Sequence, residues 1–454
     1  MYATTNPATG ELVQEFATLT DDEARTALEQ SSGAYRDWSS RPIAERADLL
    51  RAVADLHRQE SEALSHVVTL EMGKPIAQAR GEAELAASIY EYYADKGPAL
   101  LEDEELDVAG AGRAVVRTAP LGPLLGIMPW NFPLYQVARF VAPNLLLGNT
   151  ILLKHAESCP QTSLAIARVI HDAGVPTYAY QSIFATHDQT ARMIADPALQ
   201  GVSVTGSERA GRAVGALAGQ HLKKCVLELG GSDPLIILPG ADLAAAVPAA
   251  VNGRFWNAGQ VCTSMKRTIV GDRLWDDFMA KFLAEVESWQ PGDPRDDDTK
   301  LGPMSSLRAR ADVAEVVDDA VAKGATVHIG GAVPDRPGAW YPATVISGVT
   351  PDMRAYHEEI FGPVAVVHRV ASEDEAVALA NSSVYGLGGA VFAADERAAE
   401  KVADRLEVGM VGLNMLVRSS PELPFGGVKN SGIGRELGRF GLDEFANKKL
   451  VRFA

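Results

Sequence analysis

The sequence predicts an α/β fold made of two lobes. From Ala114 onward, short β-branched or apolar segments alternate with amphipathic segments of helix length, an order typical of parallel sheets covered by helices. The chain has 454 residues, well beyond the roughly 100–200 residues of an ordinary domain. No long linker rich in Pro, Gly or Ser separates the two halves. We therefore expect two rigidly apposed lobes with the active site in the cleft between them.

Helices dominate up to about residue 96, and the first sheet follows them. Thr20 and Glu23 have the spacing of a capping box, which predicts a helix start. A helix is expected over residues 160–174, where a glycine ends it, and residues 205–215 form a glycine-spaced turn into another helix. The expected strands of this lobe are LLGIM, TILLK, SIFA, GVSVT and KCVLEL.

A second α/β series begins after a boundary near residues 228–231. Ser372 and Glu375 predict a further capped helix within it. The other expected elements are helices near residues 242–258, 274–286 and 306–323 and the strands PLIIL, TVHI, AVVHRV and GGAVF.

Two segments stand apart from both lobes. LEDEELDVAGAGRAVVRT predicts an exposed excursion of two strands, and the terminal KKLVRFA predicts a strand without a partner in its own chain. Unpaired strand edges readily pair with another chain. We therefore expect a homodimer or a homotetramer.

The composition excludes several classes of partner. Lys and Arg number 42 against 59 Asp and Glu, and the net charge of −17 repels a phosphate backbone, so nucleic acid is not expected. Residues 118–138 carry no charge, but their four prolines break any continuous helix, so no membrane partner is expected. The N-terminus lacks the features of a signal peptide, and the three cysteines are far apart. We expect a cytoplasmic protein without a metal site.

Cys262, in GQVCTS, is the first candidate for chemistry. A thiolate is a strong nucleophile, and a nearby helix end or dipole can lower its pKa. Glu228, in LELGGSDP, closes an apolar strand, where a buried carboxylate is costly unless it has a partner or a task. A lone cysteine or strand-end glutamate is more often structural, so both candidates depend on their surroundings.

Three further motifs add groups suited to a nucleotide and an oxyanion. Asn131 lies between two aromatic residues in PWNFP, where its amide can donate hydrogen bonds to an oxyanion. Lys154 and Glu157 follow a buried strand in ILLKHAES, at the sheet edge where nucleotides bind in open α/β folds. Gly206 and Ser207 open a helix in TGSERAG, and its first amides can receive a diphosphate.

Taken together and in this order, these motifs resemble the aldehyde dehydrogenase superfamily. EEIFGPV, NSSVYGL and PFGGVKNSGIGRE extend the resemblance, which covers essentially the whole chain. It implies a Rossmann-like nucleotide-binding domain, an α/β catalytic domain and a β oligomerisation arm. The implied boundaries are, respectively, residues 1–98 with 119–228, residues 229–430, and residues 99–118 with 431–454.

The resemblance also implies a mechanism. Cys262 attacks the aldehyde carbon, and the amide of Asn131 with the Cys262 backbone N–H holds the oxyanion. Glu228 then activates the water that hydrolyses the thioester. The cofactor is NAD or NADP, with a weak lean to NAD because the Glu157 carboxylate repels a 2′-phosphate. The implied cofactor-binding residues are Trp130, Lys154, Glu157, Gly206, Ser207, Glu359 and Phe361.

Within the superfamily, the chain is most similar to the short bacterial succinate-semialdehyde dehydrogenases. Arg139 and Ser419 stand where those enzymes bind the distal carboxylate of the substrate, and a guanidinium fork matches a carboxylate. Trp256 replaces a second arginine of the better-known enzymes, so the carboxylate clamp is incomplete. Ser264 replaces a second cysteine, so a redox-switch disulfide is not expected.

Four alternatives stay open at this point. In the first, the substrate is a plain aliphatic aldehyde or another ω-carboxy aldehyde such as glutarate semialdehyde. In the second, the enzyme transfers the acyl group to CoA. Glu228 argues against this second alternative, because transfer to CoA needs no activated water. A cysteine hydrolase would need His221 or His357 as its base and leaves Lys154 unexplained. A non-catalytic protein would have no reason to retain the three catalytic candidates together.

Overall fold

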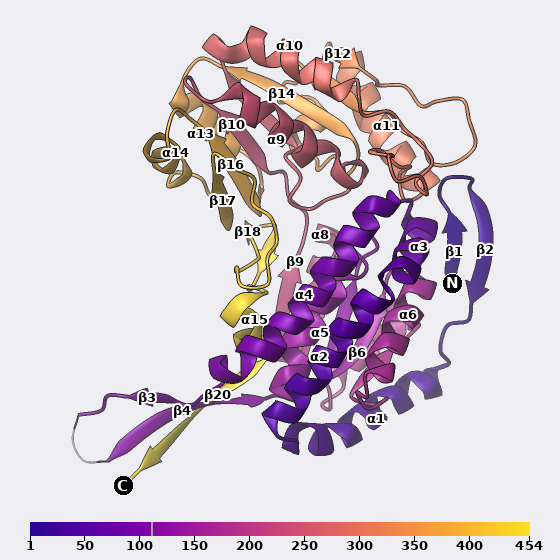
Figure 1. The fold of residues 1–454 in the computed structure, drawn as a ribbon, viewed down its shortest axis with the longest axis vertical. Coiled ribbons are helices and arrows are strands. Elements are labelled where there is room, and N and C mark those ends of the chain that lie inside the picture. Colours follow the sequence, from indigo (N-terminus) through magenta and orange to yellow (C-terminus); the bar gives the residue numbers. More distant parts are fainter. Residues whose placement is uncertain (110–111) are drawn as a thin grey trace.

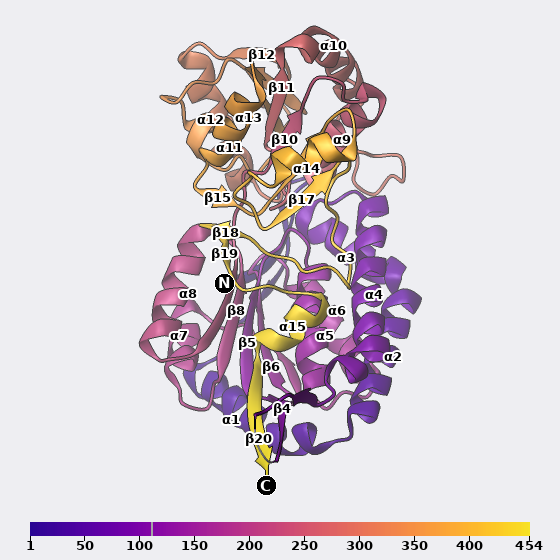
Figure 2. The ribbon, with the colours of Figure 1, turned by 90° about the vertical axis from the view of Figure 1, so that its left-hand side faces the viewer.

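The computed structural model describes residues 1–109 and 112–454. It consists of two α/β lobes and a narrow β arm that projects from one end of the molecule beside the C-terminus (Figures 1 and 2). The predicted α/β class is confirmed, and each lobe has its own largely parallel sheet.

The first lobe is built on a six-stranded sheet with the order β19-β9-β8-β5-β6-β7. All of its pairs are parallel except β19 with β9. Its strands are β5 (Pro123–Met128), β6 (Thr150–His155), β7 (Tyr180–Ser182), β8 (Gly201–Thr205), β9 (Lys224–Glu228) and β19 (Gly432–Ile433). Its helices are α1 (Asp21–Ser40), α2 (Ile43–Gln59), α3 (Ser61–Met72), α4 (Ile76–Leu100), α5 (Tyr135–Leu147), α6 (Pro160–Asp172), α7 (His187–Ala195), α8 (Glu208–Gln220) and α15 (Gly438–Glu444).

The second lobe is built on a seven-stranded sheet with the order β12-β13-β14-β11-β10-β16-β17. Its strands are β10 (Pro234–Ile237), β11 (Arg267–Gly271), β12 (Thr326–Ile329), β13 (Thr344–Ser347), β14 (Val364–Val370), β16 (Gly388–Phe392) and β17 (Met410–Leu413). Its helices are α9 (Leu243–Phe255), α10 (Trp275–Val286), α11 (Leu307–Ala322), α12 (Arg354–His357), α13 (Glu373–Asn381) and α14 (Glu396–Ala403), with 3-10 turns η1 (Trp256–Gly259) and η2 (Asp272–Leu274). A small ladder joins β15 (Tyr385–Gly386) to β18 (Val428–Lys429).

The helix starts follow the capping residues that the sequence predicts. The side chain of Thr20 accepts a hydrogen bond from the Glu23 amide, and the Glu23 side chain accepts one from the Thr20 amide, which is the full capping box. The Ser372 side chain caps α13 by accepting from the Glu375 amide, while the Glu375 carboxylate accepts from the Ala371 amide. The expected helix 242–258 ends earlier, at Phe255, because the next residues turn into a 3-10 segment with positive φ.

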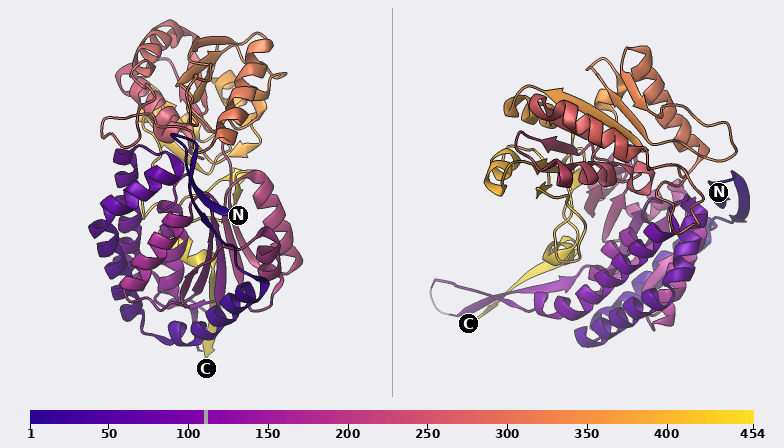
Figure 3. Two further views of the ribbon diagram at one scale, coloured as in Figure 1. Left: turned by 90° about the vertical axis from the view of Figure 1, so that its right-hand side faces the viewer. Right: turned by 45° about the horizontal axis from the view of Figure 1, so that its top comes forward.

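An N-terminal hairpin ties the two lobes together. It comprises β1 (Tyr2–Asn6) and β2 (Glu11–Phe16), and Figure 3 shows it running along the side of the molecule. On the first lobe, the Ala3 amide donates to the carbonyl of Glu157. At the tip, the Trp340 indole N–H donates to the carbonyl of Ala8 at 3.0 Å, which reaches the second lobe. The lobes are therefore joined by hydrogen bonds as well as by the chain.

The arm corrects one expectation about the C-terminal strand. β20 (Ala446–Phe453) pairs with β4 (Arg113–Pro120) along its whole length, and β3 (Glu104–Leu106) pairs with the other edge of β4. The two-strand excursion is confirmed, but the prediction that the terminal strand lacks a partner in its own chain was wrong. The partner is more than 300 residues away in sequence, so no local pattern reveals it.

The C-terminal part of the predicted arm divides between two sheets. β19 joins the six-stranded sheet and α15 packs on α5, so this part of residues 431–445 lies against the first lobe. Residues 446–454 hold the strand that belongs to the arm.

The uncharged segment 118–138 lies in the protein core. It forms the end of β4, the strand β5 and the start of α5, and most of its residues are buried. Among residues 1–109 and 112–454, no helix is both long and apolar enough to cross a bilayer. The same residues contain no cluster of His, Cys, Asp and Glu side chains arranged to hold a metal ion.

Candidate active site

Cys262 lies on a tightly held loop between α9 and β11. Asn257 and Ala258 both have a φ of 52°, so the chain leaves α9 through a turn that non-glycine residues rarely adopt. The fully buried Arg254 supports this loop by donating to the Gly259 carbonyl at 3.2 Å and to the Ser264 hydroxyl at 2.6 Å. The N–H groups of Arg254 are therefore used by hydrogen bonds within the protein. For this reason Arg254 does not take the place of the second substrate-binding arginine, whose position Trp256 holds in this chain.

Lys266 is a second support of the cysteine loop, and sequence analysis missed it. Its ammonium group donates to the carbonyls of Val261 and Cys262 at 2.8 and 2.9 Å and forms an ion pair with Glu359 at 2.9 Å. These three partners use all three N–H groups of the side chain. The available signal was a lysine directly before a buried strand, where an unpaired charge is too costly.

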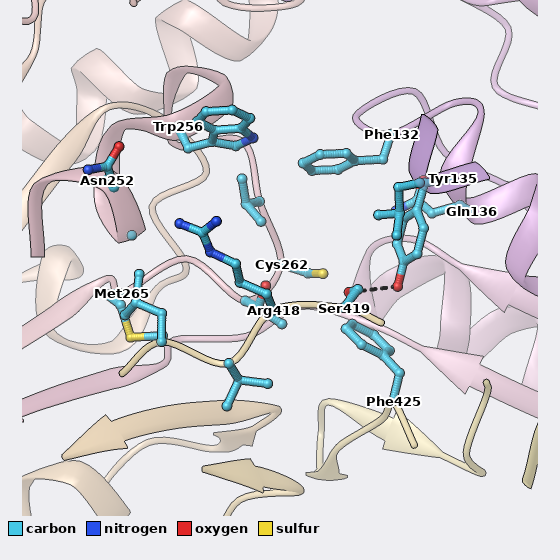
Figure 4. Close-up of a pocket in the computed structure, with 16 residues that line it drawn as sticks. Phe132, Tyr135, Gln136, Asn252, Trp256, Cys262, Met265, Arg418, Ser419 and Phe425 are labelled. Carbon is cyan, nitrogen blue, oxygen red and sulfur yellow. Dashed lines mark hydrogen bonds between the residues drawn. The ribbon is translucent and has the colours of Figure 1, made fainter. Parts of the chain in front are cut away.

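The thiol of Cys262 faces a cavity of about 270 Å³ at the meeting of the two lobes (Figure 4). Burial raises the pKa of this thiol to about 11, against the opposing effect of the positive charges of Arg139 and Lys266. The lining residues are mostly apolar or aromatic: Leu85, Phe132, Tyr135, Gln136, Asn252, Gly253, Trp256, Val261, Cys262, Thr263, Met265, Leu416, Val417, Arg418, Ser419 and Phe425.

Glu228 is a buried carboxyl group without a hydrogen-bond partner. It ends β9, only 2% of its surface is exposed, and neither side-chain oxygen is bonded to any residue that the structure describes. Burial raises its pKa well above the usual range, with the Arg139 charge opposing the shift. Its negative charge also raises the pKa of the Cys262 thiol. One of its oxygens lies beside Gly426, which follows the cavity residue Phe425 in the chain. A buried, unpartnered acid near a thiol is unusual unless it serves a task.

Asn131 is held against the cysteine loop by hydrogen bonds on both sides. Its side-chain N–H donates to the carbonyl of Gln260 at 3.0 Å, and its side-chain oxygen accepts from Gln136 at 3.1 Å. The side chain of Asn257 donates to the Asn131 carbonyl at 2.9 Å. An amide carries two N–H donors, so one donor of Asn131 is left for another acceptor.

The candidate nucleotide residues lie at the carboxyl ends of neighbouring parallel strands. Lys154 is the penultimate residue of strand β6, and its ammonium group is 4.0 Å from the half-exposed carboxylate of Glu157. Gly206 and Ser207 follow β8, and the Ser207 hydroxyl caps α8 by accepting from the Ala210 amide. β6 and β8 flank β5, so these groups share one edge of the sheet.

Three further predicted residues, Trp130, Glu359 and Phe361, lie around Lys266 and so beside the cysteine loop. The rings of Trp130 and Phe361 pack edge to face with centroids 5.7 Å apart, and both residues are partly exposed. Glu359 accepts from the Gly231 amide at 3.1 Å in addition to its ion pair with Lys266. The group therefore connects the β9–β10 turn to the loop of Cys262.

Of the two predicted substrate ligands, the structure brings only Ser419 to the cavity. Arg139 does not line the cavity and is only 1% exposed. Its guanidinium pairs with Glu436 at 2.5 Å and donates to the Thr205 hydroxyl at 2.9 Å. The expectation that Arg139 faces a substrate carboxylate does not match this placement, because the C-terminal segment supplies a carboxylate of its own.

Tyr135 connects Arg139 to the cavity. Arg139 donates to the Tyr135 hydroxyl at 3.3 Å, and that hydroxyl donates to the Ser419 hydroxyl at 2.8 Å (Figure 4). Arg139 thus stands behind the cavity wall and orients the tyrosine within it.

Neither histidine of the hydrolase alternative is part of this cavity. His221 ends α8 in the first lobe, and the His357 imidazole bonds to the Pro351 carbonyl at 2.7 Å. Among the described residues, the cavity lining contains no histidine at all. The cysteine therefore lacks the base that a cysteine hydrolase would place beside it.

The sequence pattern of the aldehyde dehydrogenase family matches residues 1–451 of this chain. The chain is also 54% identical over 451 residues to a succinate-semialdehyde dehydrogenase [NADP(+)] of Deinococcus radiodurans, covering 99% of this chain and 94% of that protein. A protein of Mycobacterium tuberculosis with the name succinate-semialdehyde dehydrogenase [NADP(+)] 1 is 46% identical, with 100% and 99% covered.

Solved structures agree with the sequence matches. The succinic semialdehyde dehydrogenase of Streptococcus pyogenes, solved with NADP+ as the cofactor, superimposes with a TM-score of 0.97 at 40% identity, with 99% of each chain covered. The chain therefore belongs to the aldehyde dehydrogenase family. The predicted family and fold are confirmed, and the protein is an oxidoreductase that acts on an aldehyde.

Proposed function

We propose that this aldehyde dehydrogenase oxidises succinate semialdehyde to succinate, with Cys262 as its nucleophile. The observation that carries the proposal is the cavity at Cys262, beside which Glu228 and Asn131 are held. The full-length similarity to proteins named for that substrate supports the choice of aldehyde.

In the first step, the Cys262 thiolate adds to the aldehyde carbon and forms a thiohemiacetal. The carbonyl oxygen becomes an oxyanion. The spare N–H of Asn131 and the backbone N–H of Cys262 are the donors for it, and both belong to segments that hydrogen bonds hold in place. A donor held before the reaction needs no reorganisation during it, which is why such groups stabilise the transition state.

In the second half, the tetrahedral carbon loses a hydride and a thioester of Cys262 remains. NAD(P), when bound, would supply the acceptor for that hydride. Glu228 takes a proton from the water that attacks the thioester, and the carboxylate product leaves with the thiolate restored. The lack of partners on both Glu228 oxygens supports this role, because they are free to bind that water.

The residues at the sheet edge fit a nicotinamide dinucleotide. A Cβ at Gly206 would meet no atom closer than 3.9 Å, so the turn before α8 is open to an approaching diphosphate. Ser207 and the first amides of α8 would hold the diphosphate, Lys154 and Glu157 the adenosine ribose, and Glu359 and Phe361 the nicotinamide half. Trp130 would pack beside it.

For the choice between the two dinucleotides, we propose NAD. The Glu157 carboxylate is half exposed beside Lys154 and would repel a 2′-phosphate while accepting hydrogen bonds from ribose hydroxyls. This proposal departs from the three relatives described above, two of which are named for NADP(+) and one of which was solved with NADP+.

We also propose the division into a nucleotide-binding domain, a catalytic domain and an arm that the sequence implies, with the change that residues 431–445 lie against the first lobe and residues 446–454 supply the C-terminal strand of the arm. The arm would pair subunits as a homodimer or homotetramer. The outer faces of β20 and β3 support this, since Leu450 on β20 is 60% exposed. The three unpaired cysteines support a reducing, cytoplasmic location.

The test is the formation of reduced nicotinamide by the purified protein with succinate semialdehyde, glutarate semialdehyde and butyraldehyde. We expect succinate semialdehyde to have the highest kcat/KM. Equal kcat/KM values for all three aldehydes would contradict the proposed substrate and indicate a general aldehyde dehydrogenase.

Two variants separate the proposed roles. Cys262→Ala removes all product, whereas Glu228→Gln keeps a rapid burst of about one reduced nicotinamide per active site and lowers the steady rate about 10²- to 10⁴-fold. A Glu228→Gln enzyme with an unchanged steady rate would exclude Glu228 as the base.

A further inference from the structure

The cavity at Cys262 contains a single charged side chain among its described lining residues, and this is Arg418. Every other residue of the lining is neutral, and no carboxylate is present to balance the charge. An apolar wall with few well-placed polar groups is the usual form of a small-molecule site. The position of this single positive charge therefore indicates where an anionic group of a ligand would bind in the cavity.

Within residues 1–109 and 112–454, no carboxylate pairs with the guanidinium of Arg418. Among the residues that the structure describes, it forms no ion pair within 4.0 Å and no side-chain hydrogen bond, although most arginines of this chain do. It extends from its backbone beside Cys262 towards Trp256 on the opposite wall (Figure 4). Its five N–H donors are therefore available to a ligand in the cavity.

Arg139 is the opposite case. Its charge is neutralised by Glu436, and its donors serve Tyr135 and Thr205. To bind a substrate, it would have to break an ion pair that is almost completely buried, and this is costly. Arg418, in contrast, can bind the distal carboxylate of an aldehyde in this cavity without breaking an ion pair.

We propose that Arg418 is the specificity-determining residue that binds the distal carboxylate of an ω-carboxy aldehyde while Cys262 attacks the other end. The inference rests on the proposed function and assigns its substrate anchor. Ser419 contributes a second bond, because its oxygen accepts from Tyr135 and its own proton is left to donate. The planar guanidinium can engage both carboxylate oxygens at once.

The experiment compares kcat/KM for succinate semialdehyde and for butyraldehyde, which has the same four-carbon chain without the carboxylate. In Arg418→Gln, kcat/KM for succinate semialdehyde falls roughly 10- to 100-fold, mainly through KM, because a charge-assisted bond is lost. The value for butyraldehyde stays within about twofold, since no interaction of that substrate is removed. Arg418→Lys keeps the charge without the fork and recovers part of the loss.

Arg308→Gln is the matched control. It removes the same charge from an exposed surface position on α11, outside the cavity, and leaves kcat/KM for both substrates unchanged. It distinguishes a local bond from a general change in the charge of the protein.

The outcomes separate this inference from the proposed function. If the wild-type enzyme prefers succinate semialdehyde but Arg418→Gln lowers kcat/KM equally for both substrates, or for neither, Arg418 does not bind the distal carboxylate and the proposed function stands. If the wild-type enzyme has no preference for the carboxylate, both are overturned. A selective loss in Arg418→Gln that is absent in Arg308→Gln supports both.

Discussion

At the scale of single residues, the site combines a thiol and a carboxyl group whose pKa values are both raised by burial. The pKa of Cys262 is raised to about 11 and that of Glu228 is also raised, each mainly by burial. The reacting form of the cysteine is the thiolate, so the resting protein holds its nucleophile in the unreactive state. The positive charges of Arg139 and Lys266 limit this shift but do not reverse it.

This state predicts a pH dependence for alkylation of Cys262 by iodoacetamide in the cofactor-free protein. Below the pKa, the thiolate fraction grows tenfold for each pH unit, so the rate rises about tenfold per unit between pH 7 and 9. Mass spectrometry of the modified peptide measures it, and Cys225→Ser removes the other partly exposed thiol. A rate that levels off below pH 8 would show that the thiol is activated in the free enzyme.

The second prediction at this scale concerns Glu157. Replacing its carboxylate by the amide in Glu157→Gln removes the repulsion of a 2′-phosphate, so kcat/KM with NADP rises about tenfold relative to NAD. Steady-state rates with both cofactors at one aldehyde concentration measure the ratio. Glu208→Gln, at the start of α8, removes a charge near the same sheet edge but away from Lys154. An unchanged ratio in Glu157→Gln would remove Glu157 from cofactor selection.

At the scale of elements, one buried ion pair positions the start of α5. Glu82 on α4 forms an ion pair with Lys74 and accepts hydrogen bonds from the amides of Leu134 and Tyr135 at 2.8 and 3.1 Å. The Lys74 ammonium lies 3.8 Å from the centre of the Phe132 ring. Phe132 and Tyr135 both line the cavity, so this pair shapes the substrate site from behind.

Breaking the pair should be costly. Glu82→Gln leaves the Lys74 charge buried without its partner, and we expect a loss of about 3–5 kcal/mol in the free energy of unfolding. Urea unfolding followed by fluorescence measures it. Glu84→Gln, two residues further along the same helix, breaks the exposed ion pair with Arg58 and should cost less than about 1 kcal/mol. Equal losses in the two variants would contradict the role of the buried pair.

At the scale of the whole molecule, the arm leaves a strand edge without a partner in the described chain. β20 is the outer strand of a three-stranded sheet whose other edge is β3. Apolar side chains stay exposed on both edge strands, with Leu450 at 60% and Leu106 at 37%. An apolar edge strand is prone to pair with another chain, which is the basis for the proposed oligomer.

We therefore expect sedimentation equilibrium to give a mass of at least twice the 48.3 kDa of one chain. Leu450→Asp puts a charge on this edge and shifts the distribution towards the monomer, while Leu307→Asp, at an exposed leucine outside the arm, does not. A wild-type protein that sediments as a monomer would exclude subunit pairing through the arm.

Local patterns predicted the parts of this protein that depend on near neighbours in sequence. The caps at Thr20 and Ser372, the α/β alternation and the motif order needed only residues a few positions apart, because helix starts and strands are governed by local hydrogen bonds and side-chain periodicity. The family resemblance belongs here too, since it is carried by short motifs.

The tertiary structure alone decided which charged groups reach the cavity. Sequence motifs predicted Arg139 as the carboxylate ligand and did not single out Arg418. In the structure, Glu436, almost 300 positions after Arg139, pairs with Arg139, whereas Arg418 lines the cavity. The pairing of β20 with β4 was hidden for the same reason. Ion pairs and strand pairs between distant segments form only when the fold brings them together, and burial then sets their energy.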